Sequence, residues 1–159
     1  MWRLLFLPLA YLAAVLDTTL GSVWSVGTIA PDALEALAFA WVVVERRRFG
    51  LLVAGAVGLL ADLLASGRVG PGMSSFFLAA LLLSALQRRW QPRHPLVQAG
   101  LIAPVAALST LATRGVSELP SVATIELAGR TSHALGVGLY TAAVAVPVLM
   151  LFGWIRPTR

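Results

Sequence analysis

The stretch GAVGLLADLLASGRVGPG, residues 55–72, decides how this chain folds. It continues an apolar run of helical length, ends that run in a glycine-rich turn, and opens a second apolar run. One carboxylate, Asp62, lies inside the apolar part. An aspartate at the centre of a membrane helix costs about 2.5–3.5 kcal/mol on insertion scales. We therefore expect a helical hairpin in which some group near the turn compensates Asp62.

The composition places the hairpin in a membrane protein. Hydrophobic residues make up 58% of the 159 residues and charged residues 12%. Soluble domains carry about 45–50% apolar and about 25% charged residues, so this chain lacks the polar surface that a soluble fold needs. We predict an all-α, polytopic membrane protein, with residues 1–159 forming a single transmembrane helical domain.

Six apolar segments are long enough to be considered as transmembrane helices: 4–20, 32–44, 49–65, 73–86, 95–113 and 131–155. Crossing the hydrocarbon core takes roughly 20 helical residues. The second and fourth segments are short, because about 14 residues rise only about 21 Å. We expect these two helices to lean on their neighbours.

The arginines predict the orientation. Nine of the 12 lie at the two termini and in the even-numbered connections, while Arg68, Arg114 and Arg130 lie on the other side. This asymmetry predicts that both termini are cytoplasmic. A net charge of +5 in a chain of this kind points to anionic lipid headgroups rather than to nucleic acid. The arginines expected to face lipid headgroups at the cytoplasmic surface are Arg46, Arg47, Arg48, Arg88 and Arg89.

The first segment has an alternative interpretation. Arg3 followed by an apolar stretch also describes a secretory signal peptide. The apolar stretch is long, and Asp17 would interrupt a normal cleavage region. We therefore expect the segment to be retained as a helix.

Small residues of the third segment repeat at helical spacing and share one face with Asp62. Such residues let helices approach closely in lipid. We expect this face to pack inside the bundle, and the alternative is that it receives a partner helix. The residues of this helix-packing face are Leu51, Ala54, Gly55, Gly58 and Ala65.

Asp62 has several candidate partners. The amides at the start of the fourth segment, around Met73, Ser74 and Ser75, could donate hydrogen bonds to the carboxylate, because anions suit helix N-termini. Arg68, Arg114 and Arg130 are alternatives. Asp62 then fastens the hairpin, although a proton or substrate site and a contact with another protein stay open. A second N-terminal signal is Asp32 with Glu35, which has the spacing of a capping box, and here we expect an ordinary N-cap near the interface.

The residues do not compose an enzyme site. His94 lies beside arginines at the predicted cytoplasmic side, whereas His133 lies at the start of the sixth segment. There is no cysteine, and the histidines and scattered acids supply no plausible metal set. We expect no catalytic residue, no metal and no cofactor.

The motif residues resemble those of the rod shape-determining protein MreD family. The resemblance rests on Pro31 followed by Asp32, then Gly58-x-x-x-Asp62-Leu-Leu, then Ser-Gly67-x-x-Gly70. It covers about residues 31–83, and elsewhere only the six-segment plan agrees. It implies structural roles for Pro31, Asp32, Gly58, Asp62, Gly67 and Gly70.

This resemblance also implies a fold and a function. The fold would be similar to that of the substrate-binding subunits of energy-coupling vitamin transporters. The function would be that of a non-catalytic component of the bacterial cell-elongation machinery in the cytoplasmic membrane. The implied partner is an MreC-like single-span protein and, through the complex, RodA and a class-B penicillin-binding protein. The alternative is a small-molecule-binding subunit of a transporter, for which Asp17, Asp62, Glu118, Glu126 and Arg130 are the candidate polar groups.

Overall fold

The protein is described by a computed structural model that covers residues 6–20, 29, 32–45, 48–64, 70–90, 94–117 and 124–155. Six α-helices account for nearly all of these residues. Their bounds are α1 Phe6–Leu20, α2 Ala33–Val44, α3 Arg48–Leu64, α4 Pro71–Trp90, α5 Pro95–Ser117 and α6 Thr124–Ile155. The predicted all-α class is confirmed for the described part of the chain.

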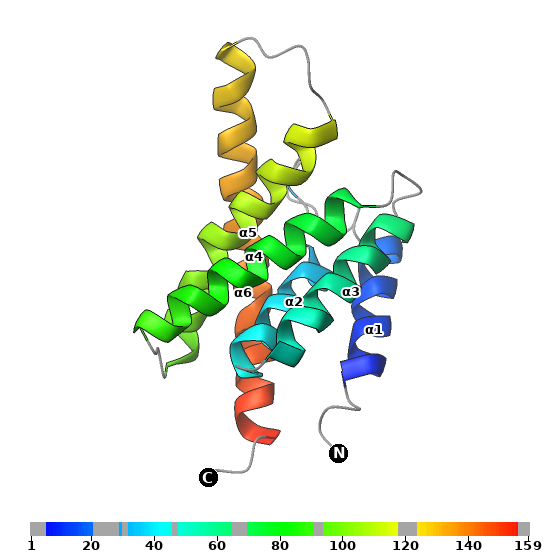
Figure 1. Ribbon diagram of the computed structural model, residues 1–159, viewed down its shortest axis with the longest axis vertical. Coiled ribbons are helices and arrows are strands. Elements are labelled where there is room, and N and C mark those ends of the chain that lie inside the picture. The colour runs from blue at the N-terminus through cyan, green and yellow to red at the C-terminus, as the bar shows by residue number, and fades with distance from the viewer. Residues whose placement is uncertain are drawn as a thin grey trace.

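Helix α2 lies at the centre of the bundle, and it contacts each of the other five helices (Figure 1). Its residues Leu34–Val44 are all buried. A helix that is apolar all round is stable only where it is surrounded, and here protein surrounds it. At 1.5 Å per residue its 12 residues rise about 18 Å, which is less than the thickness of a bilayer core. So short a helix is acceptable here because the neighbouring helices cover it.

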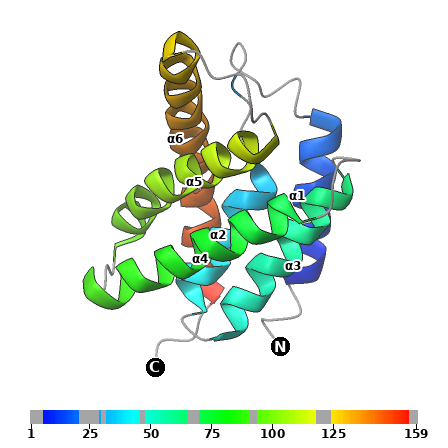
Figure 2. The same ribbon diagram turned by 45° about the horizontal axis from the view of Figure 1, so that its top comes forward.

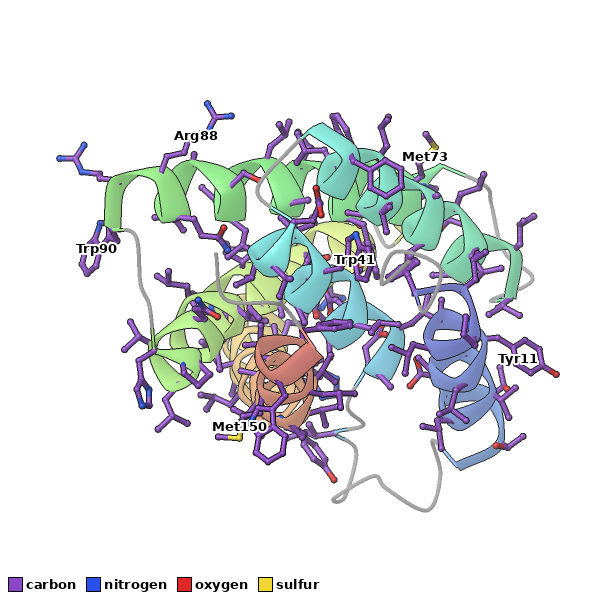
Figure 3. The ribbon with its side chains drawn as sticks, turned by 90° about the horizontal axis from the view of Figure 1, so that it is seen from below. Tyr11, Trp41, Met73, Arg88, Trp90 and Met150 are labelled. Atoms are coloured by element: carbon purple, nitrogen blue, oxygen red, sulfur yellow. The ribbon has the colours of Figure 1, made fainter. Side chains whose placement is uncertain are left out.

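An aromatic cluster fixes the position of α2 against its neighbours. The indole of Trp41 is fully buried and lies at the middle of the molecule (Figure 3). Its ring centroid is 4.6 Å from that of Phe6 on α1 and 5.4 Å from that of Phe152 on α6. The Phe39 ring lies 5.9 Å from the Phe76 ring of α4. Aromatic pairs at these distances add to the stability from burial, so this cluster holds four helices together.

Helices α3 to α6 form two hairpins beside α2, one of α3 with α4 and one of α5 with α6 (Figure 2). A β-carbon on Gly138 of α6 would meet the carbonyl oxygen of Ala103 and lie 2.9 Å from the amide nitrogen of Ala107, both on α5. Glycine at this crossing lets the two backbones touch. Helix α6, with 32 residues, rises about 48 Å and extends past the rest of the bundle.

Three helices extend by several residues beyond the predicted segments, and α5 ends at Ser117, four residues past the predicted 113. Helix α4 runs from Pro71 to Trp90, beyond both ends of the predicted 73–86. Pro71 can occupy the first turn because it lacks only an amide that would stay unbonded there. Helix α6 begins at Thr124, seven residues before the predicted start at Thr131. These extensions contain polar residues, which an apolar pattern does not include although the helix continues through them.

Over the residues that the structure describes, two helices are long and apolar enough to cross a membrane, within Pro95–Thr113 and Gly129–Trp154. Three shorter apolar helices, Phe6–Thr19, Ala33–Val44 and Phe49–Leu64, accompany them. Length and composition thus support two of the six predicted spans. The start of α1 and the end of α6 lie on the same side of the bundle, the side where α2 ends and α3 begins (Figures 1 and 2).

Candidate functional site

The carboxylate of Asp62 binds the N-terminus of α4. Its Oδ2 accepts hydrogen bonds from the amides of Gly70 at 2.8 Å and Met73 at 3.1 Å, and its Oδ1 accepts one from the amide of Gly72 at 2.8 Å. Asp62 itself is buried near the end of α3. Three backbone donors that α4 could not otherwise satisfy are thereby paired, and the negative charge lies at the positive end of the helix dipole.

Two glycines allow this contact. A β-carbon on Gly72 would strike Oδ1 of Asp62 and lie 3.0 Å from the carbonyl oxygen of Gly58. A β-carbon on Gly58 would lie 2.7 Å from the carbonyl oxygen of Gly72 and 2.9 Å from the α-carbon of Met73. Helices α3 and α4 therefore cross with their backbones in contact, one turn before Asp62.

Gly70 supplies the turn into α4. Its φ of +132° lies in a region that residues with a β-carbon rarely adopt. This conformation lets Gly70 direct its amide to Asp62 while its carbonyl oxygen accepts a 2.9 Å hydrogen bond from the amide of Ser74. We call Gly58, Asp62, Gly70 and Gly72 together the α3–α4 junction.

The predicted donors for Asp62 were correct in kind but not in every position. The amide of Met73 takes part, whereas that of Ser74 binds the carbonyl oxygen of Gly70. Sequence reasoning did not foresee Gly70 and Gly72 as donors. Among the alternative partners, Arg68 and the side chain of Arg114 lie outside the described residues.

A second carboxylate contact joins α1 to α2. The Oδ1 and Oδ2 atoms of Asp17 accept the amides of Ala33 and Leu34, each at 2.8 Å. Asp32 is the N-cap of α2, and its Oδ1 accepts the amide of Glu35 at 2.7 Å. Both carboxylates therefore accept amides of the first turn of α2.

Asp32 is the ordinary N-cap that the sequence predicts, and Glu35 does not complete a capping box. Its side chain binds the hydroxyl of Ser109 on α5 instead of returning to the amide of Asp32. That amide donates to Oγ1 of Thr141 on α6 at 3.5 Å. Ser109 and Thr141 are buried, so the polar contacts of α2 reach two helices that sequence spacing could not connect to it. We call Asp17, Asp32 and Glu35 the acidic cluster.

The other residues that the sequence analysis singled out belong to the helix-packing face, the arginine groups and the family motif. On the helix-packing face, Ala54, Gly55 and Gly58 are buried and Leu51 is half-buried. Gly55 faces Phe77 of α4, so part of this face packs within the hairpin. Arg88 and Arg89 are exposed in the last turn of α4, and Figure 3 shows Arg88 projecting outward. Pro31, Arg46, Arg47, Ala65 and Gly67 lie outside the described residues, as does the side chain of Arg48.

Three of the candidate transporter residues have described side chains, and each of the three lies on a different helix. Asp17 binds the N-terminus of α2 and Asp62 that of α4. Arg130 lies in the second turn of α6. Glu118 and the side chain of Glu126 are outside the described residues. Over the described ranges, no group of three histidine or acidic side chains is arranged to bind a metal ion.

Comparison of the chain with protein-family models, curated proteins and solved structures finds no match.

Proposed function

We propose that this protein is a non-catalytic scaffold of the bacterial cell-elongation machinery that binds the transmembrane helix of an MreC-like single-span protein. The observation that supports it is the α3–α4 junction. Gly58, Asp62 and Gly70 belong to the motif that resembles the MreD family, and they meet at this one place. Both oxygens of Asp62 are used by backbone amides, so the motif serves the shape of the hairpin rather than a reaction.

The surface of the bundle suits a partner in the membrane. Large apolar side chains are exposed on several helices, among them Leu7 and Tyr11 on α1, Leu52 on α3 and Leu78 on α4. Tyr11 projects away from the bundle in Figure 3. In lipid such side chains face hydrocarbon or another helix, and close packing drives association. A helix bound in this way should stay bound at high salt, since salt screens charges and not packing.

The proposal includes six transmembrane helices with both termini in the cytoplasm of a bacterium. Two observations support this arrangement. The arginines are distributed asymmetrically, and the start of α1 and the end of α6 lie on the same side of the bundle. The short helix α2 fits this arrangement because protein, not lipid, surrounds it. RodA and a class-B penicillin-binding protein would associate with this protein through the partner. The protein itself would catalyse no step.

Affinity purification from the native membrane in mild detergent tests the function. We expect a stoichiometric single-span protein with a periplasmic domain, accompanied by cell-wall synthesis proteins, and its recovery should be equal at low and high salt. Arg88→Ala is the matched control, because an exposed arginine at the end of α4 should not change recovery. Loss of the partner at high salt would contradict association by apolar packing.

The second candidate is a substrate-binding subunit of a small-molecule transporter. The observation in its favour is the polar cluster of Asp17, Asp32 and Glu35 inside a bundle with an implied likeness to such subunits. The same purification separates the two functions. Recovery of paired ATP-hydrolysing subunits together with a bound vitamin would establish the transporter and reject the scaffold.

A further inference from the structure

Helix α4 has an exposed apolar face that ends in two arginines. Leu78, Leu82 and Ala85 are exposed at steps of four and three residues. Arg88 and Arg89 follow at the next steps of three and four, in the last turn of the helix, and both are exposed. Residues at this spacing share one side of a helix, so the apolar side chains and the arginines form one continuous surface. We call these five residues the outer face of α4.

The apolar part of this face has the length of one lipid leaflet. Arg88 follows Leu78 by ten residues, which rise about 15 Å along a helix. The hydrocarbon core of a bilayer is about 30 Å thick, so each leaflet contributes about 15 Å. With Leu78 at the middle of the bilayer, the two guanidinium groups therefore reach the level of the lipid headgroups.

An exposed tryptophan marks the same level. Trp90 is the last residue of α4 and is 68% exposed, and Figure 3 shows Arg88 and Trp90 projecting from this end of the helix. Tryptophan is enriched where the hydrocarbon core meets the headgroups, because its ring is apolar and its N–H is polar. The indole thus agrees with the headgroup level that the helix length gives for the arginines.

The charges of Arg88 and Arg89 are not balanced by a described acidic side chain. Within the part of the chain that the structure describes, neither guanidinium group has an ion pair or a hydrogen bond. Glu45, which follows the end of α2 on the same side of the bundle, is buried at 5% exposure. The acidic cluster and Asp62 lie towards the opposite side, where α2 begins and α3 ends. Two adjacent cations are therefore available to an anion from outside the chain.

We propose that the outer face of α4 binds one anionic phospholipid of the phosphatidylglycerol kind, with its phosphate at Arg88 and Arg89 and its acyl chains along Leu78, Leu82 and Ala85. Guanidinium groups bind phosphate oxygens with two parallel hydrogen bonds. A soluble polyanion would use only the arginines, whereas a phospholipid matches both the charged and the apolar part of the face. The site is a particular place on α4, in contrast to a general attraction of all cytoplasmic arginines to the membrane, and it does not depend on the proposed scaffold role.

Native mass spectrometry of the full-length protein tests the site, in detergent with equal amounts of phosphatidylglycerol and phosphatidylcholine. We expect one bound phosphatidylglycerol, retained severalfold more often than phosphatidylcholine. Arg88→Ala combined with Arg89→Ala should abolish this preference. The matched control, Arg156→Ala combined with Arg159→Ala, removes two positive charges elsewhere in the chain and should keep it. The proposal is overturned if the preference survives in the folded first variant, or if both variants lose it equally through net charge.

A measurement on the wild-type sequence keeps the test decisive if the first variant does not fold. In lipid nanodiscs, brominated acyl chains quench nearby tryptophans, and the difference between wild type and Trp90→Phe isolates the signal of Trp90. We expect stronger quenching when phosphatidylglycerol carries the bromine than when the same fraction of phosphatidylcholine carries it. Equal quenching would contradict the site. Displacement of the bound phosphatidylglycerol by an acidic peptide would assign the arginines to a soluble partner and also reject the lipid.

Discussion

At the scale of single residues, Asp62 shows how a carboxylate becomes stable in an apolar chain. It accepts three backbone amides of one helix start, so its charge is balanced by donors that need an acceptor themselves. A membrane helix start that is not capped would leave these donors unbonded, at several kcal/mol each in hydrocarbon. The carboxylate and the turn therefore require each other.

Replacing Asp62 with leucine should destabilise the protein strongly, and replacing it with asparagine should do so less. Leucine leaves the amides of Gly70, Gly72 and Met73 without an acceptor, at about 1–3 kcal/mol for each buried group. Asparagine keeps one acceptor oxygen. Thermal unfolding in detergent measures both changes. An Asp62→Leu protein as stable as wild type but without its cellular function would show that Asp62 acts through a partner or substrate.

Glycine substitutions separate close backbone contact from helix propensity. Gly72→Ala should destabilise by about 1–3 kcal/mol, because its β-carbon meets Asp62 and the carbonyl oxygen of Gly58. Gly100→Ala is the matched control on α5, where a β-carbon meets nothing within 4 Å. It should stabilise by up to about 1 kcal/mol through helix propensity. Equal effects of the two variants in chemical unfolding would contradict the observed crossing of α3 and α4.

At the scale of the elements, the two helices of each hairpin are in backbone contact at a glycine. Gly138→Ala places a β-carbon against Ala103 and Ala107 and should force α5 and α6 apart, at a cost of about 1–3 kcal/mol. Gly153→Ala lies on the same helix with open space around it and should leave the stability close to that of wild type. Protease digestion of the detergent-solubilised proteins compares them. If both variants resist digestion equally, the α5–α6 crossing is not tight.

At the scale of the whole molecule, the orientation in the membrane is testable because the chain has no cysteine. We expect Arg89→Cys to resist an impermeant thiol reagent in intact cells, since the arginine asymmetry predicts that the end of α4 is cytoplasmic. Ser74→Cys and Ser121→Cys should react. Gly70 is unsuitable for a cysteine because its φ is positive. Labelling of Arg89→Cys in sealed cells would reverse the predicted orientation.

The central position of α2 also belongs to the whole molecule. Apart from Glu35 its sequence is apolar, which is equally compatible with a helix in lipid and with one in a protein core. Only packing shows that the other helices surround it and that Trp41 joins it to α1 and α6. A short apolar segment in such a chain therefore indicates a buried helix as readily as a thin span.

The sequence by itself determined six helices in order and the role of Asp62 within its hairpin. Both depend on local spacing: apolar runs end at glycine, proline or arginine, and Asp62 lies only eight to 11 residues from its donors. The acidic cluster was decided by the tertiary structure alone. Asp17 caps a helix 16 residues away, Glu35 binds Ser109, and Asp32 meets Thr141 across 109 residues. No spacing rule reaches that far, because such contacts depend on which helix faces pack together, and apolar faces of similar composition do not specify their partners.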